Sequence, residues 1–319
     1  MKTAIGIDIG GTKISIALGN EKGKILSECL IPTRTGTQTR QSVRELIRNI
    51  KKLLEKYPAP KYKNLGIGAG LPGPVDPHKG TVPVSPHLGG WQGIPLRKIL
   101  EKETGLPAVL ANDANAAAVG EKFFGQGRGV SDFIYMTVST GIGGGIVVNR
   151  RLLEGAGFVA GEVGHMTIVP DGDPCKCGKR GCLEAYASGT AIAGYVERQL
   201  RRGTKSILGK LKSKERVTAQ IVGLAARRRD RLAIQAYERA GFYLGIGIAN
   251  LLNILNPEKI ILGGGVLKSS PSGFWSSMRA SCKRDAWPEA IEAVKIVRSH
   301  LKGNSGNLGA LALVFDKGS

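Results

Sequence analysis

The sequence predicts an α/β fold made of two units of related build. Its 319 residues are 42% apolar and 5% aromatic, which is enough to fill two packed cores and excludes a small disulfide-stapled module. The 46 glycines indicate many tight turns and close approaches of the backbone. A strand, a small-residue turn and a second strand are expected around residues 8–12 and again around 139–145. This repeated pattern is the reason for expecting two related units.

The first unit is expected to open with strands and continue with a helix. Alternating and β-branched runs predict strands at residues 2–9, 14–18, 24–31, 64–69 and 108–111. Gly10 and Gly11 form the turn between the first two strands, and residues 40–57 have the pattern of a helix. The last strand leads into an alanine-rich helix that begins at Asn112 and Asp113.

The second unit is expected to combine short strands with long helices. The patterns predict strands at 132–139, 146–148 and 259–262, a glycine-rich turn at 140–145, and a helix at 230–255. A last helix is expected at 305–315 and returns to the first unit. Gly241, Gly245 and Gly247 lie within the long helix. Because glycine lowers helix stability, these three positions indicate close packing against a neighbour.

We place the domain boundary near Gly120. The predicted small N-terminal α/β domain covers residues 1–119 and is joined by the C-terminal helix within 303–319. The predicted large C-terminal α/β domain covers residues 120–302 and includes a loop at 165–184 that is rich in metal-binding residue types.

The charge is strongly basic, with 46 Lys and Arg against 25 Asp and Glu and a formal net charge of +21. Residues 196–231 alone contain twelve Lys or Arg against three acids. One interpretation is a basic face for nucleic acid or another polyanion. The other, a solvated helix pair, is favoured because no stacking aromatics are interleaved with the charges.

We expect a cytoplasmic protein that does not enter a membrane. Asp8 would lie inside the apolar core of a signal peptide, and the apolar stretch 242–255 is too short for a membrane span. Three of the five cysteines fall within eight residues. This spacing fits a reducing compartment and a metal site better than a disulfide framework.

The strongest local signal is a set of metal-ligand types with the spacing H-x9-C-x-C-x4-C. Its members are His165, Cys175, Cys177 and Cys182. Three thiolates and one imidazole complete a tetrahedron around Zn²⁺ and leave no open position, so we expect a structural zinc site. The alternative is a group of incidental free cysteines.

A second signal is a glycine turn beside an acid. Asp8 precedes the turn Gly10-Gly11-Thr12-Lys13, where backbone N–H groups can approach an anion. Asp8 could hold a nucleotide-bound Mg²⁺ through water while Thr12 and Lys13 approach phosphates. The alternative is an ordinary hairpin. No G-x-x-x-x-G-K-[ST] motif occurs, so a P-loop is not expected.

Three carboxylates lie at positions where they could take part in catalysis or in substrate binding. Asp113 begins a helix and is either an N-cap or a general base that deprotonates a substrate hydroxyl. Glu162 and Glu184 flank the zinc-ligand spacing, so a closed metal site would hold both at the rim of one loop. They could accept adjacent sugar hydroxyls, or they could be surface glutamates.

Taken together, these motifs resemble the ROK family (repressors, open reading frames and kinases) over almost the whole chain. Asp8 to Lys13 is similar to the family's first phosphate motif, Thr137 to Gly145 to its second and Leu262 to Val266 to its adenosine motif. Asn112-Asp113 resembles the sugar-binding Asn and catalytic Asp. Residues 154–165 and 175–184 resemble the signature stretch and the zinc loop.

The resemblance implies two ribonuclease H-like, actin-like α/β domains with an interdomain cleft and a zinc-binding loop. It also implies an ATP- and Mg²⁺-dependent kinase in which Asp113 activates the 6-hydroxyl of a hexose. The implied sugar-binding residues are Gly73, Asn112, Glu162, His165 and Glu184, with His165 also a zinc ligand. The implied ATP-binding residues are Asp8, Gly10, Gly11, Thr12, Lys13, Thr140, Gly141, Gly263, Gly264 and Gly265.

Glucose is the expected substrate, and several alternatives stay open. His87 stands where the family has Asn in a Ser-Pro-Asn-Leu segment, which leaves N-acetylmannosamine and N-acetylglucosamine as alternative sugars. The basic surface would also suit polyphosphate as donor. A sugar-sensing regulator is a further alternative, but its N-terminal helix-turn-helix would have to precede a phosphate motif that begins at residue 8. A homodimer is expected from the resemblance, and nucleic acid is not a favoured partner.

Overall fold

The computed structural model describes residues 1–82, 85, 88–210, 216–301 and 303–316. Its contacts divide the chain into two compact units. Unit 1 comprises Met1–Ser131, Gly145–Gly161 and Ser299–Ser319, and unit 2 comprises Asp132–Gly144 and Glu162–Arg298. This division differs from the predicted boundary at Gly120, because helix α3 (Asp113–Phe124) runs through that glycine and lies wholly in unit 1.

Unit 1 is built around a five-stranded sheet of order β3-β2-β1-β4-β5. Its strands are β1 (Lys2–Ile9), β2 (Lys13–Asn20), β3 (Ile25–Pro32), β4 (Lys63–Leu71) and β5 (Ala108–Asn112). All five strands predicted for this unit are confirmed. The first three form an antiparallel meander, whereas β1, β4 and β5 run parallel to one another.

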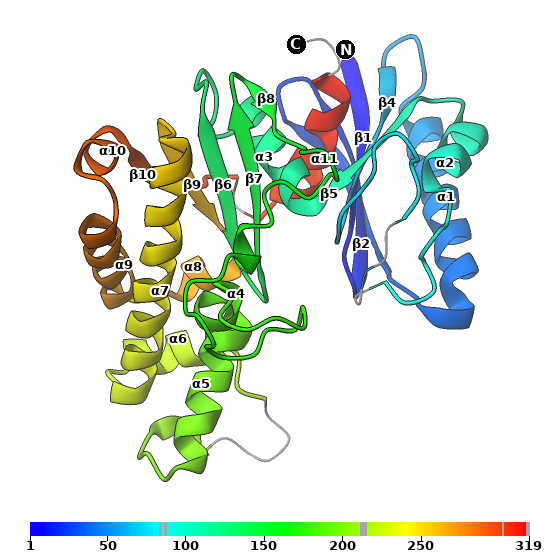
Figure 1. Ribbon diagram of the computed structural model, residues 1–319. Coiled ribbons are helices and arrows are strands. Elements are labelled where there is room, and N and C mark those ends of the chain that lie inside the picture. The colour runs from blue at the N-terminus through cyan, green and yellow to red at the C-terminus, as the bar shows by residue number, and fades with distance from the viewer. Residues whose placement is uncertain (83–84, 86–87, 211–215, 302, 317–319) are drawn as a thin grey trace. The chain divides into compact units, whose positions relative to one another are not determined.

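The two faces of this sheet bear different side chains because neighbouring residues of a strand point to opposite sides. Ile5, Ile7 and Ile9 join the larger apolar core together with α1 (Thr39–Lys56) and α2 (Leu96–Thr104). Helix α11 (Ser305–Phe315) packs on the opposite side of β1 and β4, as Figure 1 shows. A Cβ on Gly6 would lie 2.7 Å from the Asn307 carbonyl oxygen, so α11 approaches the strand backbone closely.

Unit 2 combines a second sheet with most of the helices. The second sheet has the order β10-β9-β6-β7-β8, with β6 (Phe133–Val138), β7 (Ile142–Val148), β8 (Arg151–Leu152), β9 (Lys259–Gly263) and β10 (Lys295–Arg298). Strand β8 and the part of β7 from Gly145 onward are assigned to unit 1. The helices are α4 (Glu184–Ala187), α5 (Gly189–Arg201), α6 (Ala219–Arg227), α7 (Arg231–Leu255), α8 (Gly265–Ser269), α9 (Ser272–Asp285) and α10 (Pro288–Ala293). Short 3₁₀ turns occur at Gly36–Gln38, Val163–His165 and Ile207–Lys210.

One predicted element is wrong in part, because the turn expected over 140–145 is shorter. Strand β7 already begins at Ile142, so three of the glycines lie within a strand. Strand interiors disfavour glycine unless another backbone approaches closely. Gly145 meets this condition, because a Cβ there would lie 2.5 Å from Cβ of Ala118 in α3.

The long predicted helix is confirmed as α7, and so is its close packing. Helix α9 lies against it along the glycine face (Figure 1). A Cβ on Gly241 would overlap the Phe274 carbonyl, and one on Gly245 would overlap the Met278 carbonyl. A Cβ on Gly247 would lie 2.6 Å from the Leu183 side chain. Helix α7 therefore also packs closely against the segment that follows the cysteines.

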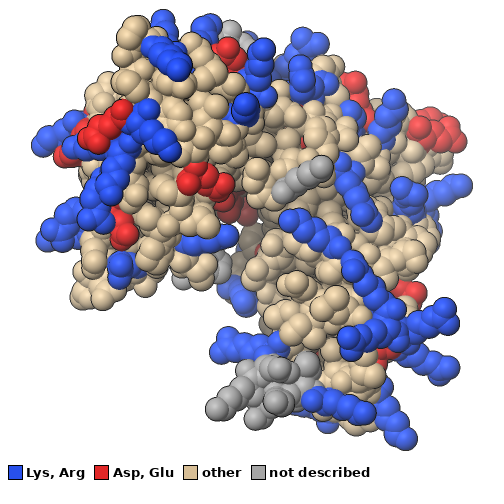
Figure 2. Space-filling model, turned by 180° about the vertical axis from the view of Figure 1, so that it is seen from behind, with Lys and Arg blue, Asp and Glu red and all other residues tan. Residues whose placement is uncertain are grey.

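The basic stretch 196–231 is largely exposed where the structure describes it. Arg201 and Arg202 end α5, and Arg227 to Arg229 end α6, all with exposed side chains. Residues 211–215 lie outside the described residues. Lys and Arg side chains are spread widely over the face shown in Figure 2. Within the described part of the chain, every helix falls short of the length or hydrophobicity that a membrane crossing requires.

Candidate functional site

Strand register brings the predicted residues of unit 1 to one edge of its sheet. Asp8 in β1 is paired with Gly70 in β4, and Leu71 in β4 is paired with Asn112 in β5. Because the carboxyl ends of parallel strands share an edge, the loops after these three strands lie beside one another, and this edge is where α/β proteins bind ligands. The turn at Gly10 to Lys13, the loop at Gly73 and the start of α3 therefore belong to one group.

The turn after Asp8 is held open toward solvent. The Gly10 N–H donates to the Lys13 carbonyl at 3.0 Å, and the Thr33 hydroxyl donates to the Gly10 carbonyl at 2.6 Å. The side chains of Thr12 and Lys13 are exposed, as is Gly11. A braced turn with exposed N–H groups and a lysine fits an anion such as a phosphate.

The start of α3 shows that Asp113 is not the N-cap of this helix. Asn112 is the N-cap, because its Oδ1 accepts from the Ala114 and Asn115 N–H groups at 2.9 and 3.2 Å. Its Nδ2 donates to the Gly73 carbonyl at 3.1 Å, which holds the loop after β4 against the helix start. Asp113 occupies the first helical turn with its side chain exposed, and its Oδ1 accepts the Ala114 N–H at 2.8 Å. Asp113 therefore presents an acidic group at the sheet edge while Asn112 caps the helix.

The predicted nucleotide residues of unit 2 also gather at one strand edge. Thr137 in β6 is paired with Gly263 in β9, so the turn containing Thr140 and Gly141 lies beside Gly263–Gly265. Gly264 adopts φ +101°, and a Cβ there would overlap the Val138 carbonyl. Only glycine fits this position, which keeps the backbone of the two turns in close contact.

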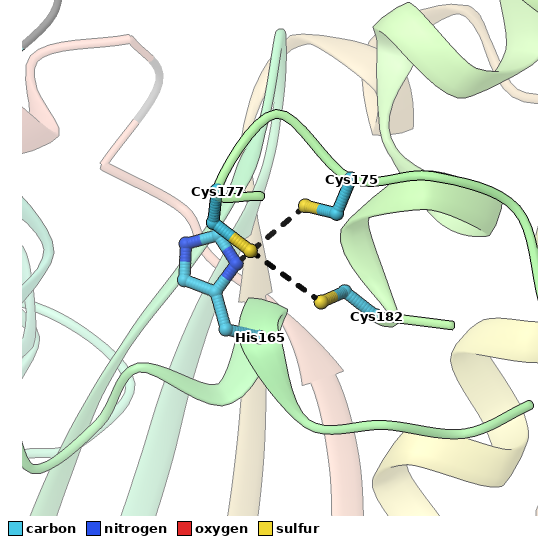
Figure 3. A group of neighbouring side chains, drawn as sticks. All are labelled: His165, Cys175, Cys177 and Cys182. Atoms are coloured by element: carbon cyan, nitrogen blue, oxygen red, sulfur yellow. Dashed lines mark hydrogen bonds between the residues drawn. The ribbon is translucent and has the colours of Figure 1, made fainter. Parts of the chain in front are cut away.

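The zinc ligands predicted from the sequence lie together in unit 2. The imidazole of His165 and the thiols of Cys175, Cys177 and Cys182 place one ligand atom each within 4.8 Å of one another. Figure 3 shows the three thiols and the ring converging on one point. Cys177 Sγ is 3.7 Å from Cys182 Sγ, and Cys175 Sγ is 3.8 Å from His165 Nδ1. The donor set and spacing fit a tetrahedral structural zinc site.

Protons compete with a cation for these sulfurs. Burial, reinforced by the neighbouring thiols, raises the pKa of the Cys182 thiol to about 12. Burial also raises the pKa of Cys175 above its ordinary value. Metal binding at neutral pH therefore requires proton release from these thiols.

The sugar-binding candidates of unit 2 are attached to this cluster. Glu162 Oε2 is 3.9 Å from His165 Nε2, while Nδ1 of the same ring faces Cys175. Glu184 follows Cys182 by two residues at the start of α4, and its Oε2 accepts the Ile142 N–H at 2.8 Å. The candidate zinc ligands thus lie between the two carboxylates in the sequence, with Glu162 just before the first ligand and Glu184 just after the last.

Sequence reasoning missed a cluster of side chains around Arg239 that contacts the outer part of the zinc loop, named the Arg239 clamp below. The Arg239 guanidinium lies over the rings of Tyr186, Tyr195 and Tyr243 at 4.9, 5.1 and 4.9 Å from their centres. It also forms an ion pair with Asp173 at 3.6 Å, two residues before Cys175. Tyr243 lies one helical turn from Arg239 in α7, but Asp173, Tyr186 and Tyr195 are far from it in the sequence, so no local pattern indicates the whole clamp.

The predicted residues thus form three groups: the sheet edge of unit 1, the strand edge of unit 2, and the zinc cluster with its two glutamates. His87 lies outside the described residues. Sequence reasoning also missed two threonines that brace the turns, Thr33 in unit 1 and Thr190 in unit 2.

Comparison with known proteins identifies the family. The ROK family model matches residues 4–317. The chain belongs to the ROK family. It is 35% identical over 314 residues to a glucokinase of Thermotoga maritima, covering 98% of this chain and 97% of that one. It is 36% identical to a xylose repressor of Caldicellulosiruptor bescii, covering 98% of this chain and 77% of the repressor.

A solved structure supports the fold. The crystal structure of a ROK family glucokinase from Streptomyces griseus, in complex with glucose and AMPPNP, matches with a TM-score of 0.79 and 33% identity over 98% of each chain. The chain therefore has the mixed α/β architecture of the actin-like ROK kinases, with two sheets. Its ROK relatives include both kinases and repressors.

We expect Cys177→Ser to lose bound zinc and to weaken sugar affinity together, because the cluster fixes Glu162 and Glu184. Metal content by mass spectrometry and glucose titration by calorimetry measure the two effects. Cys29→Ser is the control, since Cys29 lies in β3 outside the cluster and should retain the metal. Zinc-free Cys177→Ser that binds glucose with wild-type affinity would contradict this account.

We expect Asp8→Asn to be more stable than the wild type at neutral pH. Burial raises the pKa of the Asp8 carboxyl above its ordinary value of 3.8, and the Lys13 ammonium only partly offsets this. The folded protein therefore loses stability as pH rises from about 3.8 through the raised pKa. Asn cannot ionise, so the variant should melt at a higher temperature than the wild type at pH 7.5, with the gain vanishing below pH 3.8.

The control variant is Asp76→Asn, for which the change in stability at neutral pH should be in the opposite direction. Desolvation tends to raise the pKa of Asp76, but N–H groups of Lys79 and His78 and the Lys79 ammonium together lower it. Asp76→Asn should therefore lose stability at neutral pH. Equal melting temperatures for Asp8→Asn and the wild type from pH 4 to 8 would show that Asp8 carries no burial penalty.

Proposed function

We propose that this protein is an ATP-dependent hexokinase that phosphorylates the 6-hydroxyl of glucose. The observation that carries the proposal is the register of β1, β4 and β5. It places exposed Asp113 on the same edge of one sheet as the turn from Asp8 to Lys13. A carboxylate beside a phosphate-binding turn is the arrangement that phosphoryl transfer to a hydroxyl requires.

Asp113 is the proposed general base. It would accept the proton of the 6-hydroxyl as that oxygen attacks the γ-phosphorus of ATP. The phosphoryl-transfer transition state is loose, so positioning matters more than a strong base and an ordinary carboxylate suffices. Asn112 supports this role, because it caps α3 and fixes Asp113 at the helix start.

The remaining sugar contacts come from groups able to accept or donate hydroxyl hydrogen bonds. They are Gly73 and Asn112 in unit 1 and Glu162, His165 and Glu184 in unit 2. Carboxylates accept sugar O–H donors well, and a missing hydroxyl would leave a buried acceptor unpaired. This is how such a site would distinguish hexoses.

The glycine turns are the proposed nucleotide contacts. N–H groups of Gly11 and Gly141, with Thr12, Lys13 and Thr140, would receive the phosphates, and Gly263–Gly265 would lie against the adenosine. Gly10, whose N–H donates to the Lys13 carbonyl, would form the phosphate-binding turn itself. Mg²⁺ bound with ATP neutralises phosphate charge, and Asp8 would hold it through water. Zn²⁺ in the Cys₃His cluster would be structural, since the four ligands leave no open position.

A sugar-sensing regulator is a second candidate, because the chain is also 36% identical to a xylose repressor. Such a protein would bind a sugar without transferring phosphate. Kinase activity is the better-supported proposal, because the sequence retains an acid at Asp113 as well as both phosphate turns. Cytoplasmic location, a homodimer and ATP in preference to polyphosphate stay predictions.

We expect Asp113→Asn to bind glucose with an affinity close to wild type and to lose turnover by at least about 100-fold, the usual contribution of a general base. A coupled assay of ADP release measures turnover, and calorimetry measures glucose binding. Asp285→Asn provides the control, since Asp285 ends α9, away from the proposed site residues, and should leave turnover near wild type.

Wild-type kcat in Asp113→Asn would refute the assignment of the base. The same ADP-release assay with glucose, mannose, N-acetylglucosamine and N-acetylmannosamine ranks the sugars. Polyphosphate releases no ADP, so this donor is tested by measuring the sugar phosphate that forms when polyphosphate replaces ATP. Sugar binding with no sugar phosphate formed from any pair would favour the regulator.

A further inference from the structure

The turn that carries Thr140 and Gly141 is held by the segment that follows the zinc loop. The Ile142 N–H donates to Glu184 Oε2 at 2.8 Å, and the Gly189 N–H donates to the Ser139 carbonyl at 2.7 Å. The Thr190 hydroxyl donates to the Thr140 carbonyl at 2.8 Å. The turn's position in unit 2 therefore depends on residues 184–190.

The peptide of Ile142 is enclosed from both sides. A Cβ on Gly141 would overlap the Glu184 carboxylate, so the side chain lies directly against the turn. A Cβ on Gly164 would overlap the Ile142 carbonyl, and Gly164 is the residue before the zinc ligand His165. The turn is thus packed between the two ends of the zinc loop.

We propose that Glu184 and Thr190 couple sugar binding to nucleotide binding, an inference that rests on the proposed function. Glu184 Oε2 holds the phosphate turn, while Oε1, which takes no part in that bond, accepts a sugar hydroxyl. A bound sugar that orders this carboxylate also orders the N–H groups that receive the phosphates. Thr190 is a positioning residue that holds Thr140 from the other side.

Coupling of this kind is reciprocal. If glucose raises nucleotide affinity by some factor, the nucleotide raises glucose affinity by the same factor. The link runs through a few direct contacts within one unit, so single side chains can be tested. Glu162 offers a matched comparison, because it is also a proposed sugar-binding carboxylate but faces His165 rather than the turn.

Thr190→Val tests the positioning role. Valine has nearly the same shape as threonine but lacks the hydroxyl, so only the longer bond from the backbone N–H of residue 190 to the Thr140 carbonyl, 3.3 Å in the wild type, would remain. We expect the KM for ATP to rise about 2- to 10-fold, more than kcat falls, with glucose affinity in the absence of nucleotide unchanged. Thr190→Ser keeps the hydroxyl and should restore the wild-type KM. An unchanged KM for ATP in Thr190→Val would overturn this role.

The coupling itself is measured as the ratio of Kd values for a non-hydrolysable ATP analogue without and with saturating glucose. We expect a ratio of about 10 in the wild type. Glu184→Asp shortens the side chain so that it cannot reach the turn and the sugar together, and its ratio should fall to about 1. Glu162→Asp should need more glucose for saturation but keep the wild-type ratio.

The outcomes separate this inference from the proposed function. Wild-type protein that fails to bind either glucose or the analogue would contradict the proposed function. Wild-type protein that binds both, together with an unchanged ratio in Glu184→Asp at saturating glucose, would overturn the coupling and leave the kinase proposal standing. A ratio lost equally in Glu162→Asp would also overturn it, because the effect would not depend on contact with the turn.

Discussion

The parallel pairing of β1, β4 and β5 is the constraint on which the candidate site of unit 1 depends. Its register sets Asp8 beside Gly70 and Leu71 beside Asn112. A slip of one residue in a strand would turn every side chain to the other face and move the loops apart. The position of Asp113, and so the chemistry proposed for it, therefore depends on the backbone hydrogen bonds between these strands. Asn112 then caps α3 where β5 ends and the helix begins.

In unit 2 the same strand-edge principle is combined with a metal-ligand cluster. The pairing of β6 with β9 sets Thr140 and Gly141 beside Gly263–Gly265. The three cysteines and His165 then fix a loop that has little regular secondary structure of its own. Glu162 and Glu184 lie beside ligands of this cluster. A purely structural metal ion would therefore still determine the positions of these two carboxylates. The Arg239 clamp adds a second attachment for the same loop.

Much of the fold and of the candidate site could be predicted from the sequence, because it depends on local residue patterns. The strands of unit 1 and helix α7 follow from residue periodicity, and the zinc ligands follow from their spacing within eighteen residues. The turn predicted over 140–145 is too long, because β7 begins at Ile142 and the close approach of Gly145 to Ala118 is a long-range contact that no local pattern reveals. The contact-based division after Ser131 differs from the boundary predicted near Gly120, since long-range packing decides which unit a helix joins. Thr190 and Arg239 act on partners far along the chain.

The central claim is that this chain transfers phosphate to a sugar rather than only binding one. Phosphorus NMR of the protein mixed with glucose, ATP and Mg²⁺ tests it most directly, because substrate and products give separate signals. The account predicts loss of the ATP signals with matching growth of ADP and a hexose 6-phosphate, at a rate proportional to protein concentration. An unchanged ATP spectrum in a sample where calorimetry shows bound glucose would contradict it.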